Sequence, residues 1–149
     1  MNSAHDAVVD LMRRELDAAE YREIRQLWKR HSIAEDNRDL PGLISTLTEN
    51  CVYELVQTGE RWEGHEGAAR FYTELLTAFP DIRFDLTNIV IGPQGVFEEA
   101  DVTATRDGER LAWKVAILFP WDPDARKFKG ERVWTDAPIP LAPGEAEHQ

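Results

Sequence analysis

Residues 96–108 read VFEEADVTATRDG, and their alternation predicts a β-strand that ends in an Asp-Gly hairpin turn. Glu99 and Asp101 fall on one face of that strand, and threonines follow them on the same face. Carboxylates at positions i and i+2 of a strand lie about 7 Å apart. In a sheltered cavity, burial and like charge would raise the pKa of at least one of them, giving an acid–base pair with Asp101 as the preferred catalytic carboxylate. On a surface facing water, the same row would be an ordinary solvated strand face.

Three further side chains could take part in proton transfer. His31 lies one turn after Leu27 and Trp28 on the apolar face of a predicted helix, where an imidazole is either a proton shuttle or a packed core residue. Glu35 lies another turn along and could orient that imidazole. In the predicted strand CVYELVQ, the Tyr53 hydroxyl is either a donor to a substrate oxygen or a core group. The histidines lack metal-ligand spacing and no glycine-rich phosphate loop is present, so we expect neither a metal nor a cofactor.

The composition of the chain limits its possible functions. With 149 residues, 42% hydrophobic and 30% charged, the chain is expected to form one globular domain. A formal net charge of −11 should repel nucleic acid and anionic membranes, so neither is an expected partner. The charged N-terminus does not read as a signal peptide, and no apolar run approaches the roughly 20 residues of a membrane span. The single cysteine, Cys51, excludes an intrachain disulfide, and we expect a cytoplasmic location.

The elements that must position these groups are helices first and strands afterwards. Helical spacing runs from a capping box at Ser3 to about residue 19 and again over residues 21–34, and RDLPGLISTLTEN predicts a break and a short helix. After CVYELVQ, GERWEGHEG reads as a loop and GAARFYTELLTAFPD as an amphipathic helix. Four strands are expected next, in IRFDLTNIVIG, VFEEADVTATR, ERLAWKVAILFPW and KGERVWTD. We therefore predict an α+β domain over residues 20–136, in which a curved, mixed or antiparallel sheet packs around the helices. A helical extension, residues 1–19, precedes it, and a flexible Pro-rich acidic tail, residues 137–149, follows it.

This layout resembles the SnoaL-like branch of the nuclear transport factor 2-like superfamily over about residues 20 to 136. The likeness rests on D-L-x-G-L before the first strand, on G-x-E-G-x-x-x-F at the start of the next helix, and on A-F-P-D at its end. The resemblance implies a cone, in which helices close one end of a bent sheet around a largely apolar pocket. The family includes polyketide cyclases, ketosteroid isomerase, limonene epoxide hydrolase, dehydratases and members without known catalysis, so the fold does not by itself give the function.

The resemblance also places individual residues. It puts Glu99 and Asp101 on the concave side of their strand, at an R-x-D of limonene epoxide hydrolase, and because the arginine is missing we do not expect epoxide hydrolysis. Tyr53 matches a tyrosine of that enzyme. Leu55 stands where the hydrolase has an asparagine and near the base aspartate of ketosteroid isomerase, which weakens a steroid-isomerase mechanism. His31 takes the place of the isomerase's oxyanion-hole tyrosine.

The last predicted strand departs from the family pattern. The aspartate that cyclases and epoxide hydrolases use there is replaced by Val133, and Glu131 could substitute from one pleat away. Aromatic, aliphatic and acidic side chains from several elements are expected to line the pocket and bind the ligand. They are Trp28, Glu35, Leu55, Trp62, Phe71, Phe79, Phe97, Trp113, Val115, Glu131 and Val133.

These expectations combine into a predicted function. We expect a cofactor-independent acid–base enzyme, of cyclase, isomerase, dehydratase or hydrolase type, acting on an apolar oxygenated small molecule. Asp101 and Glu99 would form the acid–base pair, with Tyr53 or His31 as hydrogen-bond donor. The alternative, motivated by the missing aspartate on the last strand, is a non-catalytic ligand-binding or dimerisation module of the same fold.

Self-association is a separate expectation. Val102, Ala104 and Ala116 are expected on the convex face of the sheet, where they would form an apolar strip that a monomer exposes. We therefore expect a homodimer through this face.

Overall fold

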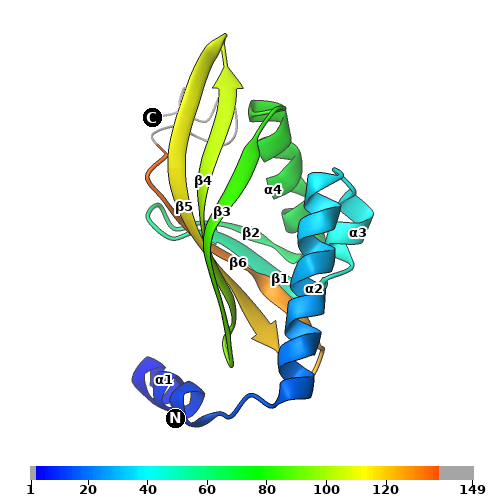
Figure 1. The fold of residues 1–149 in the computed structure, drawn as a ribbon, viewed down its shortest axis with the longest axis vertical. Coiled ribbons are helices and arrows are strands. Elements are labelled where there is room, and N and C mark those ends of the chain that lie inside the picture. The colour runs from blue at the N-terminus through cyan, green and yellow to red at the C-terminus, as the bar shows by residue number, and fades with distance from the viewer. Residues whose placement is uncertain (1–2, 138–149) are drawn as a thin grey trace.

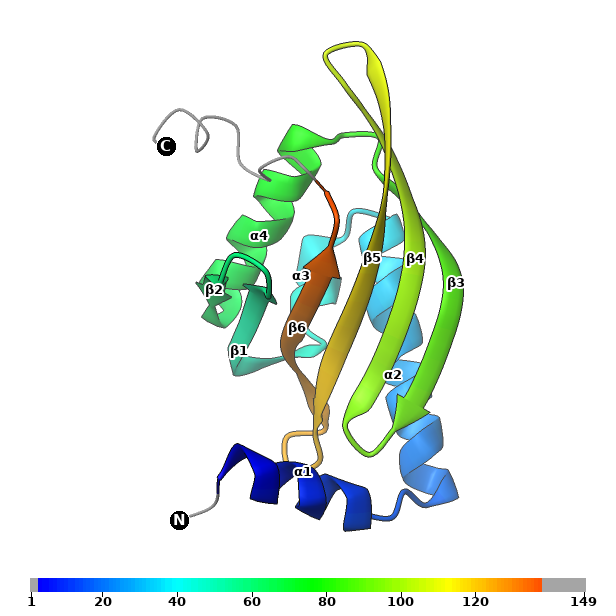
Figure 2. The same ribbon diagram turned by 90° about the vertical axis from the view of Figure 1, so that its left-hand side faces the viewer.

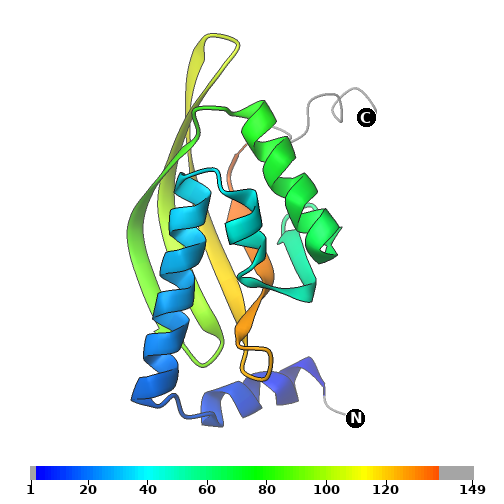
Figure 3. The ribbon, with the colours of Figure 1, turned by 90° about the vertical axis from the view of Figure 1, so that its right-hand side faces the viewer.

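Three helices pack on one face of a six-stranded sheet in this computed structural model, which describes residues 3–137 (Figure 1). Figure 3 shows α2, α3 and α4 in front of that face, and α1 lying across one end of the molecule. The elements are α1 (Ala4–Arg13), α2 (Ala18–Asp36), α3 (Leu40–Ile44), β1 (Leu47–Leu55), β2 (Glu60–Glu63), α4 (Gly64–Ala78), β3 (Arg83–Gly92), β4 (Gly95–Arg106), β5 (Glu109–Asp122) and β6 (Lys127–Thr135). The chain therefore has the α+β cone that the sequence predicts.

The sheet is mixed, with strand order β2-β1-β6-β5-β4-β3 (Figure 2). All neighbouring strands are antiparallel except β1 and β6, which run parallel. The hairpins β3–β4 and β4–β5 follow the predicted turns. The parallel pair sets Tyr53 of β1 opposite Glu131 of β6. Residues 78 positions apart thus meet within the sheet.

Gly130 gives β6 the bend that turns Glu131 inward. Its φ of +115° is a conformation that side chains rarely adopt, and a Cβ there would collide with the Val52 carbonyl oxygen of β1. Phe128 and Glu131 are both buried although they lie three positions apart, so the alternation of the strand changes phase at this glycine. The close approach of the two parallel strands therefore depends on glycine at this position.

The N-terminal helices differ from the expected boundary. The predicted capping box is present, because the Ser3 and Asp6 side chains accept each other's backbone N–H. However, α1 ends at Arg13, not near residue 19. Asp17 caps a new helix by accepting the Glu20 N–H at 2.8 Å, so the chain breaks between the two helices.

The other elements lie near their predicted places, although β1 begins at Leu47 and not at Cys51, and α4 begins at Gly64, inside the predicted loop. Residues 60–63, read as loop, form the short strand β2, which pairs with β1 through Tyr53 and Trp62. The predicted tail, apart from its first residue, lies outside the described residues. Within residues 3–137, no helix is both long enough and apolar enough to cross a membrane. The cytoplasmic location stays a prediction.

The core fills the space between the sheet and α2 and α4. On α2 the buried residues recur at helical spacing, at Ile24, Leu27, His31 and Ala34. Val102 and Ala104 of β4 are 0% exposed within this core. The expectation that they lie on the convex face is therefore wrong, and the apolar strip inferred from them does not exist. The homodimer itself stays a prediction.

Candidate active site

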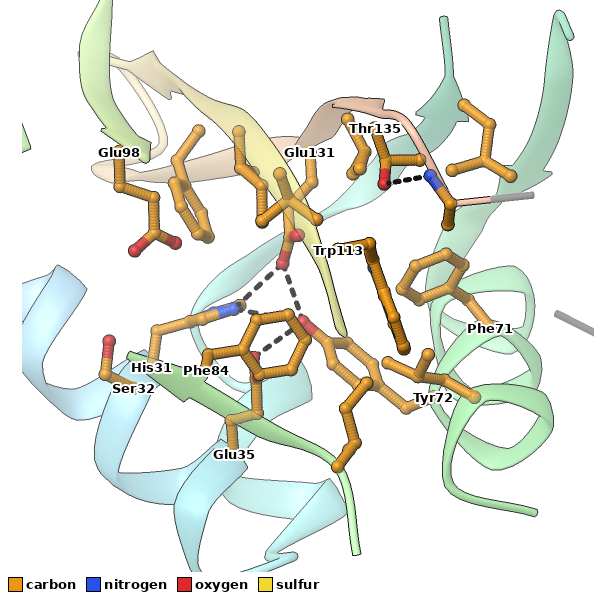
Figure 4. A pocket seen from close by; sticks show the side chains of 18 of the residues that line it. His31, Ser32, Glu35, Phe71, Tyr72, Phe84, Glu98, Trp113, Glu131 and Thr135 are labelled. Carbon is orange, nitrogen blue, oxygen red and sulfur yellow. Dashed lines mark hydrogen bonds and ion pairs between the residues drawn. The ribbon is translucent and has the colours of Figure 1, made fainter. Parts of the chain in front are cut away.

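A cavity of about 560 Å³ opens between the sheet and helices α2 and α4 (Figure 4). This volume falls in the range of about 300–1,000 Å³ that small-molecule sites occupy. Its polar side chains include His31, Ser32 and Glu35 from α2, Glu98 from β4 and Glu131 from β6. The cavity is thus an apolar hollow into which several acidic groups converge.

His31 and Glu131 form a buried pair at the wall of the cavity, 1% and 3% exposed. His31 Nε2 lies 3.1 Å from Glu131 Oε2, and Nδ1 lies 2.7 Å from Thr46 Oγ1. The Thr46 hydroxyl donates to the Leu43 carbonyl at 2.6 Å, so it accepts from Nδ1–H. One further proton must lie between Nε2 and Oε2, either on the imidazole or on the carboxyl group.

Two tyrosines complete a directional chain of hydrogen bonds to Glu131. The Tyr72 hydroxyl donates to Glu131 Oε2 at 2.6 Å, and Tyr53 lies 3.1 Å from the Tyr72 oxygen, to which it donates. Burial, followed by the Glu131 charge, raises the pKa of both phenols well above 10. Both tyrosines therefore keep their protons, and Tyr72 accepts from Tyr53 while it donates to Glu131, which holds the Glu131 carboxyl group in place.

Glu35 is the half-buried carboxyl group next to this network. Its Oε2 lies 3.4 Å from the Tyr72 oxygen, and no hydrogen bond joins it to His31, so the expectation that it orients the imidazole directly is wrong. Burial and then the Glu131 charge raise the pKa of Glu35 from 4.5 to about 7, whereas His31 and Tyr72 lower it. This group can therefore gain or lose a proton at neutral pH.

Glu98 on β4 is the second carboxyl group that lines the cavity. Burial, followed by the charges of Glu131 and Glu35, raises its pKa from 4.5 to about 8. Sequence reasoning did not name it as a candidate. The signal was present, because Glu98 is the only acidic residue on a strand face that otherwise carries Val96 and three small or β-branched apolar residues before Arg106 at its end.

Glu99 and Asp101, the predicted catalytic pair, lie on the opposite face of β4 and do not line the cavity. Asp101 forms an ion pair with Lys114 at 2.6 Å, and these side chains are 50% and 77% exposed. Glu99 accepts a hydrogen bond from Asn88 at 3.3 Å on the same outer side. The prediction was wrong because the resemblance placed the acidic face inward, whereas burial of the apolar face is energetically favoured.

The predicted ligand-binding residues divide into two groups. Eight of the predicted ligand-binding side chains line the cavity, and His31, predicted as a catalytic residue, lines it as well. A ligand-binding role requires this position, but the role itself stays a prediction. They are Trp28, His31, Glu35, Leu55, Phe71, Trp113, Val115, Glu131 and Val133.

Four other predicted residues do not line the cavity. Tyr53 is fully buried behind Tyr72 and reaches the cavity only through the hydrogen-bond chain. Trp62 packs against Phe71 and donates its indole N–H to Glu74, and Phe79 packs against Trp113 in the core. Phe97 lies on the outer face of β4 with Glu99. The sequence did not predict that Tyr72 and Thr46 belong to the site. Only tertiary contacts connect them to His31, and such contacts leave no local pattern in the sequence.

The same groups could also be considered as metal ligands. His31, Glu35 and Glu131 each offer a ligand atom, and these atoms lie within 4.8 Å of one another. Such an N/O set suits a transition-metal ion chemically. However, the Tyr72 O–H and the proton shared with His31 already use the lone pairs of Glu131 Oε2, and a metal would have to displace both. The expectation of no metal stays a prediction.

Several solved structures share this fold. A protein from Jannaschia sp. CCS1 assigned as a SnoaL-like polyketide cyclase superposes with a TM-score of 0.71 at 16% identity, covering 83% of this chain and 92% of that one. An LEH-like epoxide hydrolase of M. tuberculosis superposes with a TM-score of 0.65 at 19% identity, covering 78% of this chain and 85% of that one. A Kribbella flavida protein assigned as a ketosteroid isomerase superposes with a TM-score of 0.61 at 21% identity, covering 86% of this chain and 88% of that one. At these identities the likeness shows the fold alone.

Sequence comparison gives the family. No curated protein matches the chain. The model of the SnoaL-like domain matches residues 24–126, which include the cavity-lining parts of α2, α4, β4 and β5. Because this match covers more than half of the 149 residues, the chain belongs to the SnoaL-like domain family.

Proposed function

We propose that this chain is a cofactor-independent acid–base enzyme that acts on an apolar oxygenated small molecule held in the cavity. Glu35 acts as the general base and Glu98 as the general acid. The observation that carries the proposal is that both carboxyl groups line one apolar cavity and that burial raises the pKa of each into the neutral range.

Glu35 suits the role of base because its neighbours favour the ionised form. The nearby imidazole of His31 and the Tyr72 hydroxyl both lower its pKa against the larger effect of burial, leaving it at about 7. A base whose pKa lies near the working pH combines a useful ionised fraction with a strong drive to take a proton. Glu35 would remove a proton from a carbon next to a carbonyl group, from a hydroxyl group or from a water molecule.

Glu98 suits the role of acid because no hydrogen-bond donor or cation within residues 3–137 offsets its burial. Its pKa of about 8 leaves it mostly protonated at pH 7. A protonated carboxyl group in an apolar wall can donate to a substrate oxygen on which negative charge develops. The proton taken by Glu35 and the proton given by Glu98 balance, so no cofactor is needed.

Other groups would position the substrate and the base. The His31–Glu131 pair and Tyr72 are almost inaccessible, so we treat them as positioning residues that set the charge and orientation of Glu35. Trp28 lines the cavity, and its buried Nε1–H has no hydrogen-bond partner among the described residues. Because this N–H is itself inaccessible, Trp28 presents the apolar part of its ring to the cavity.

The family supports the proposal at a coarse level. Structural neighbours are assigned as a polyketide cyclase and a ketosteroid isomerase, and one is an epoxide hydrolase, all of which handle oxygenated organic molecules by their names. This chain would do related proton transfers with its own residues, because its carboxyl groups on β4 and α2 differ from those that the family resemblance points to.

Hydrogen–deuterium exchange tests the proposal without knowledge of the substrate. We expect the protein in D₂O to accelerate exchange at the activated C–H of 2-tetralone, followed by NMR. Glu35→Gln should lose at least about a hundredfold of that acceleration. Glu99→Gln, which changes the same residue type outside the cavity, should retain it. Binding of the ketone without protein-dependent exchange, or equal rates in the two variants, would contradict the proposal.

A second function, ligand binding without catalysis, is favoured by one observation. Both ring nitrogens of His31 and Oε2 of Glu131 are satisfied by internal hydrogen bonds, as in a purely structural network. Under this alternative, wild type and Glu35→Gln would bind the ketone equally and neither would exchange its protons.

A further inference from the structure

The charged side chains that line the cavity are almost all acidic. The acidic ones are Glu35, Asp36, Glu60, Glu98 and Glu131. No lysine or arginine among residues 3–137 lines the cavity, and the remaining residues of the chain contain neither type. The one basic side chain at the wall, His31, is already hydrogen-bonded to Glu131. A ligand therefore meets several carboxyl groups with no lysine or arginine beside them.

The cations of the chain serve the outer surface instead. On the outside of the sheet, Lys114 pairs with Asp101 and Arg132 pairs with Glu54. None of the lysine or arginine ion pairs within residues 3–137 involves a carboxylate that lines the cavity. The raised pKa values of Glu35 and Glu98 share their largest cause, which is burial, and at Glu98 no counter-charge offsets it. A positive group brought in by a ligand would supply what these carboxyl groups lack.

Aromatic rings form much of the remaining wall. Six aromatic side chains line the cavity: Trp28, Phe71, Tyr72, Phe84, Trp113 and Phe119. Figure 4 shows Phe84 and Trp113 on either side of the hydrogen bond between Tyr72 and Glu131. The negative faces of aromatic rings attract ammonium groups, most strongly where water is excluded. Rings and carboxyl groups together favour a cation with a hydrocarbon body. A bare metal ion would leave most of a cavity of about 560 Å³ empty.

We propose that the cavity binds an apolar organic cation, a molecule with a hydrocarbon body and a protonated or quaternary amine that lies against Glu98 and Glu35. The inference rests on the proposed function, because it names the substrate class of the same cavity. The net charge of −11 favours the approach of such a ligand, whereas a carboxylate or phosphate ligand would be buried against like charge.

Three probes on one hydrocarbon cage test the charge preference. Isothermal titration calorimetry at pH 8 compares adamantan-1-amine as its ammonium ion, adamantan-1-ol and adamantane-1-carboxylate. We expect the ammonium ion to bind at least about tenfold more tightly than the alcohol, and the carboxylate most weakly. Equal or tighter binding of the alcohol or the carboxylate would overturn the inference, as would failure of all three to bind at millimolar concentration.

Two neighbouring variants locate the preference. Glu98→Gln keeps the shape of the wall and should lower the ratio of ammonium to alcohol affinity at least about fivefold, while the alcohol affinity shows that the cavity is intact. Glu99→Gln, the next residue on the outer face, should leave the ratio unchanged. The same effect in both variants would place the cation elsewhere and overturn the inference.

The outcomes separate this inference from the proposed function. If the ammonium preference holds and 2-tetralone exchange fails, the ligand class stands and catalysis does not. If exchange depends on Glu35 and the ammonium ion has no advantage, catalysis stands and the ligand class does not.

Discussion

Both faces of strand β4 carry carboxyl groups, but one face is buried at the cavity and the other is exposed to solvent. Glu98 faces the cavity, where burial raises its pKa to about 8. On the outer face, Asp101 forms an exposed ion pair with Lys114 and Glu99 contacts Asn88. A carboxyl group becomes a proton donor at neutral pH where water and counter-charge are both removed, and adjacent residues of one strand can differ completely in this respect. The strand face on which a carboxyl group lies, and not its residue type, therefore decides whether it can donate a proton at neutral pH.

Removing the carboxyl group of Glu131 should have the largest effect on stability. Glu131→Ala removes the acceptor of the Tyr72 hydroxyl and the partner of His31 Nε2, and leaves these two buried groups only their mutual contact at 3.2 Å. Breaking a buried pair in this way costs roughly 3–5 kcal/mol. Urea unfolding followed by tryptophan fluorescence measures the loss. Asp101→Ala, on the outer face, should leave the midpoint nearly unchanged, and equal losses at the two positions would break the comparison.

Replacing Glu98 should change the pH dependence of the free energy of unfolding. The folded chain keeps the Glu98 proton up to a pH of about 8, whereas the group has a pKa of 4.5 when unperturbed. Between these values the folded state binds more protons than the unfolded state, so this contribution to the free energy of unfolding is present below pH 4.5 and is lost as the pH rises to 8.

Urea unfolding at pH 5 and pH 9 measures this loss. Relative to Glu98→Gln, the wild type should lose on the order of 3 kcal/mol across this window. Glu99→Gln should follow the wild-type curve, and a parallel change in both variants would contradict the assignment.

A smaller effect is expected at the far end of the histidine network. Thr46→Val keeps the volume but removes the acceptor of His31 Nδ1–H, which is buried. An unsatisfied buried donor costs about 1–2 kcal/mol. Chemical denaturation gives the loss, and an unchanged stability would show that Nδ1 does not depend on Thr46.

The smallest effect is expected at the outer ion pair. Lys114→Gln removes the partner of Asp101 where both side chains are exposed. Solvent and salt screen such a pair, so we expect no measurable change in the thermal midpoint or in 2-tetralone exchange. A loss of exchange would show that the outer face takes part in function after all.

Local patterns in the sequence were enough to predict most of the fold. Alternation located the strands β3 to β6, and the Ser3 capping box marked the first helix. The parallel pairing of β1 with β6 left no such signal, because it joins residues as far apart as Tyr53 and Glu131. The start of α2 was also missed, since the cap at Asp17 competes with a continuous apolar stripe.

The site was predictable only in part. His31, Glu35 and Glu131 were named from helical and strand spacing and do line the cavity. On β4, however, a shift of one residue exchanges the two faces, and the family resemblance placed Asp101 inside where the apolar pattern places Glu98. Burial of the apolar side chains on that face outweighed the resemblance. Contacts such as that between Tyr72 and Glu131 arise from tertiary packing and have no local signature.

Carboxyl carbon NMR, recorded as a pH titration on protein labelled at glutamate, tests the central claim most directly. The resonance that disappears in Glu98→Gln identifies the group. We predict that it titrates with a midpoint of about 8. A midpoint near 4.5 would show that Glu98 is an ordinary solvated acid and would contradict its role as the proton donor of the cavity.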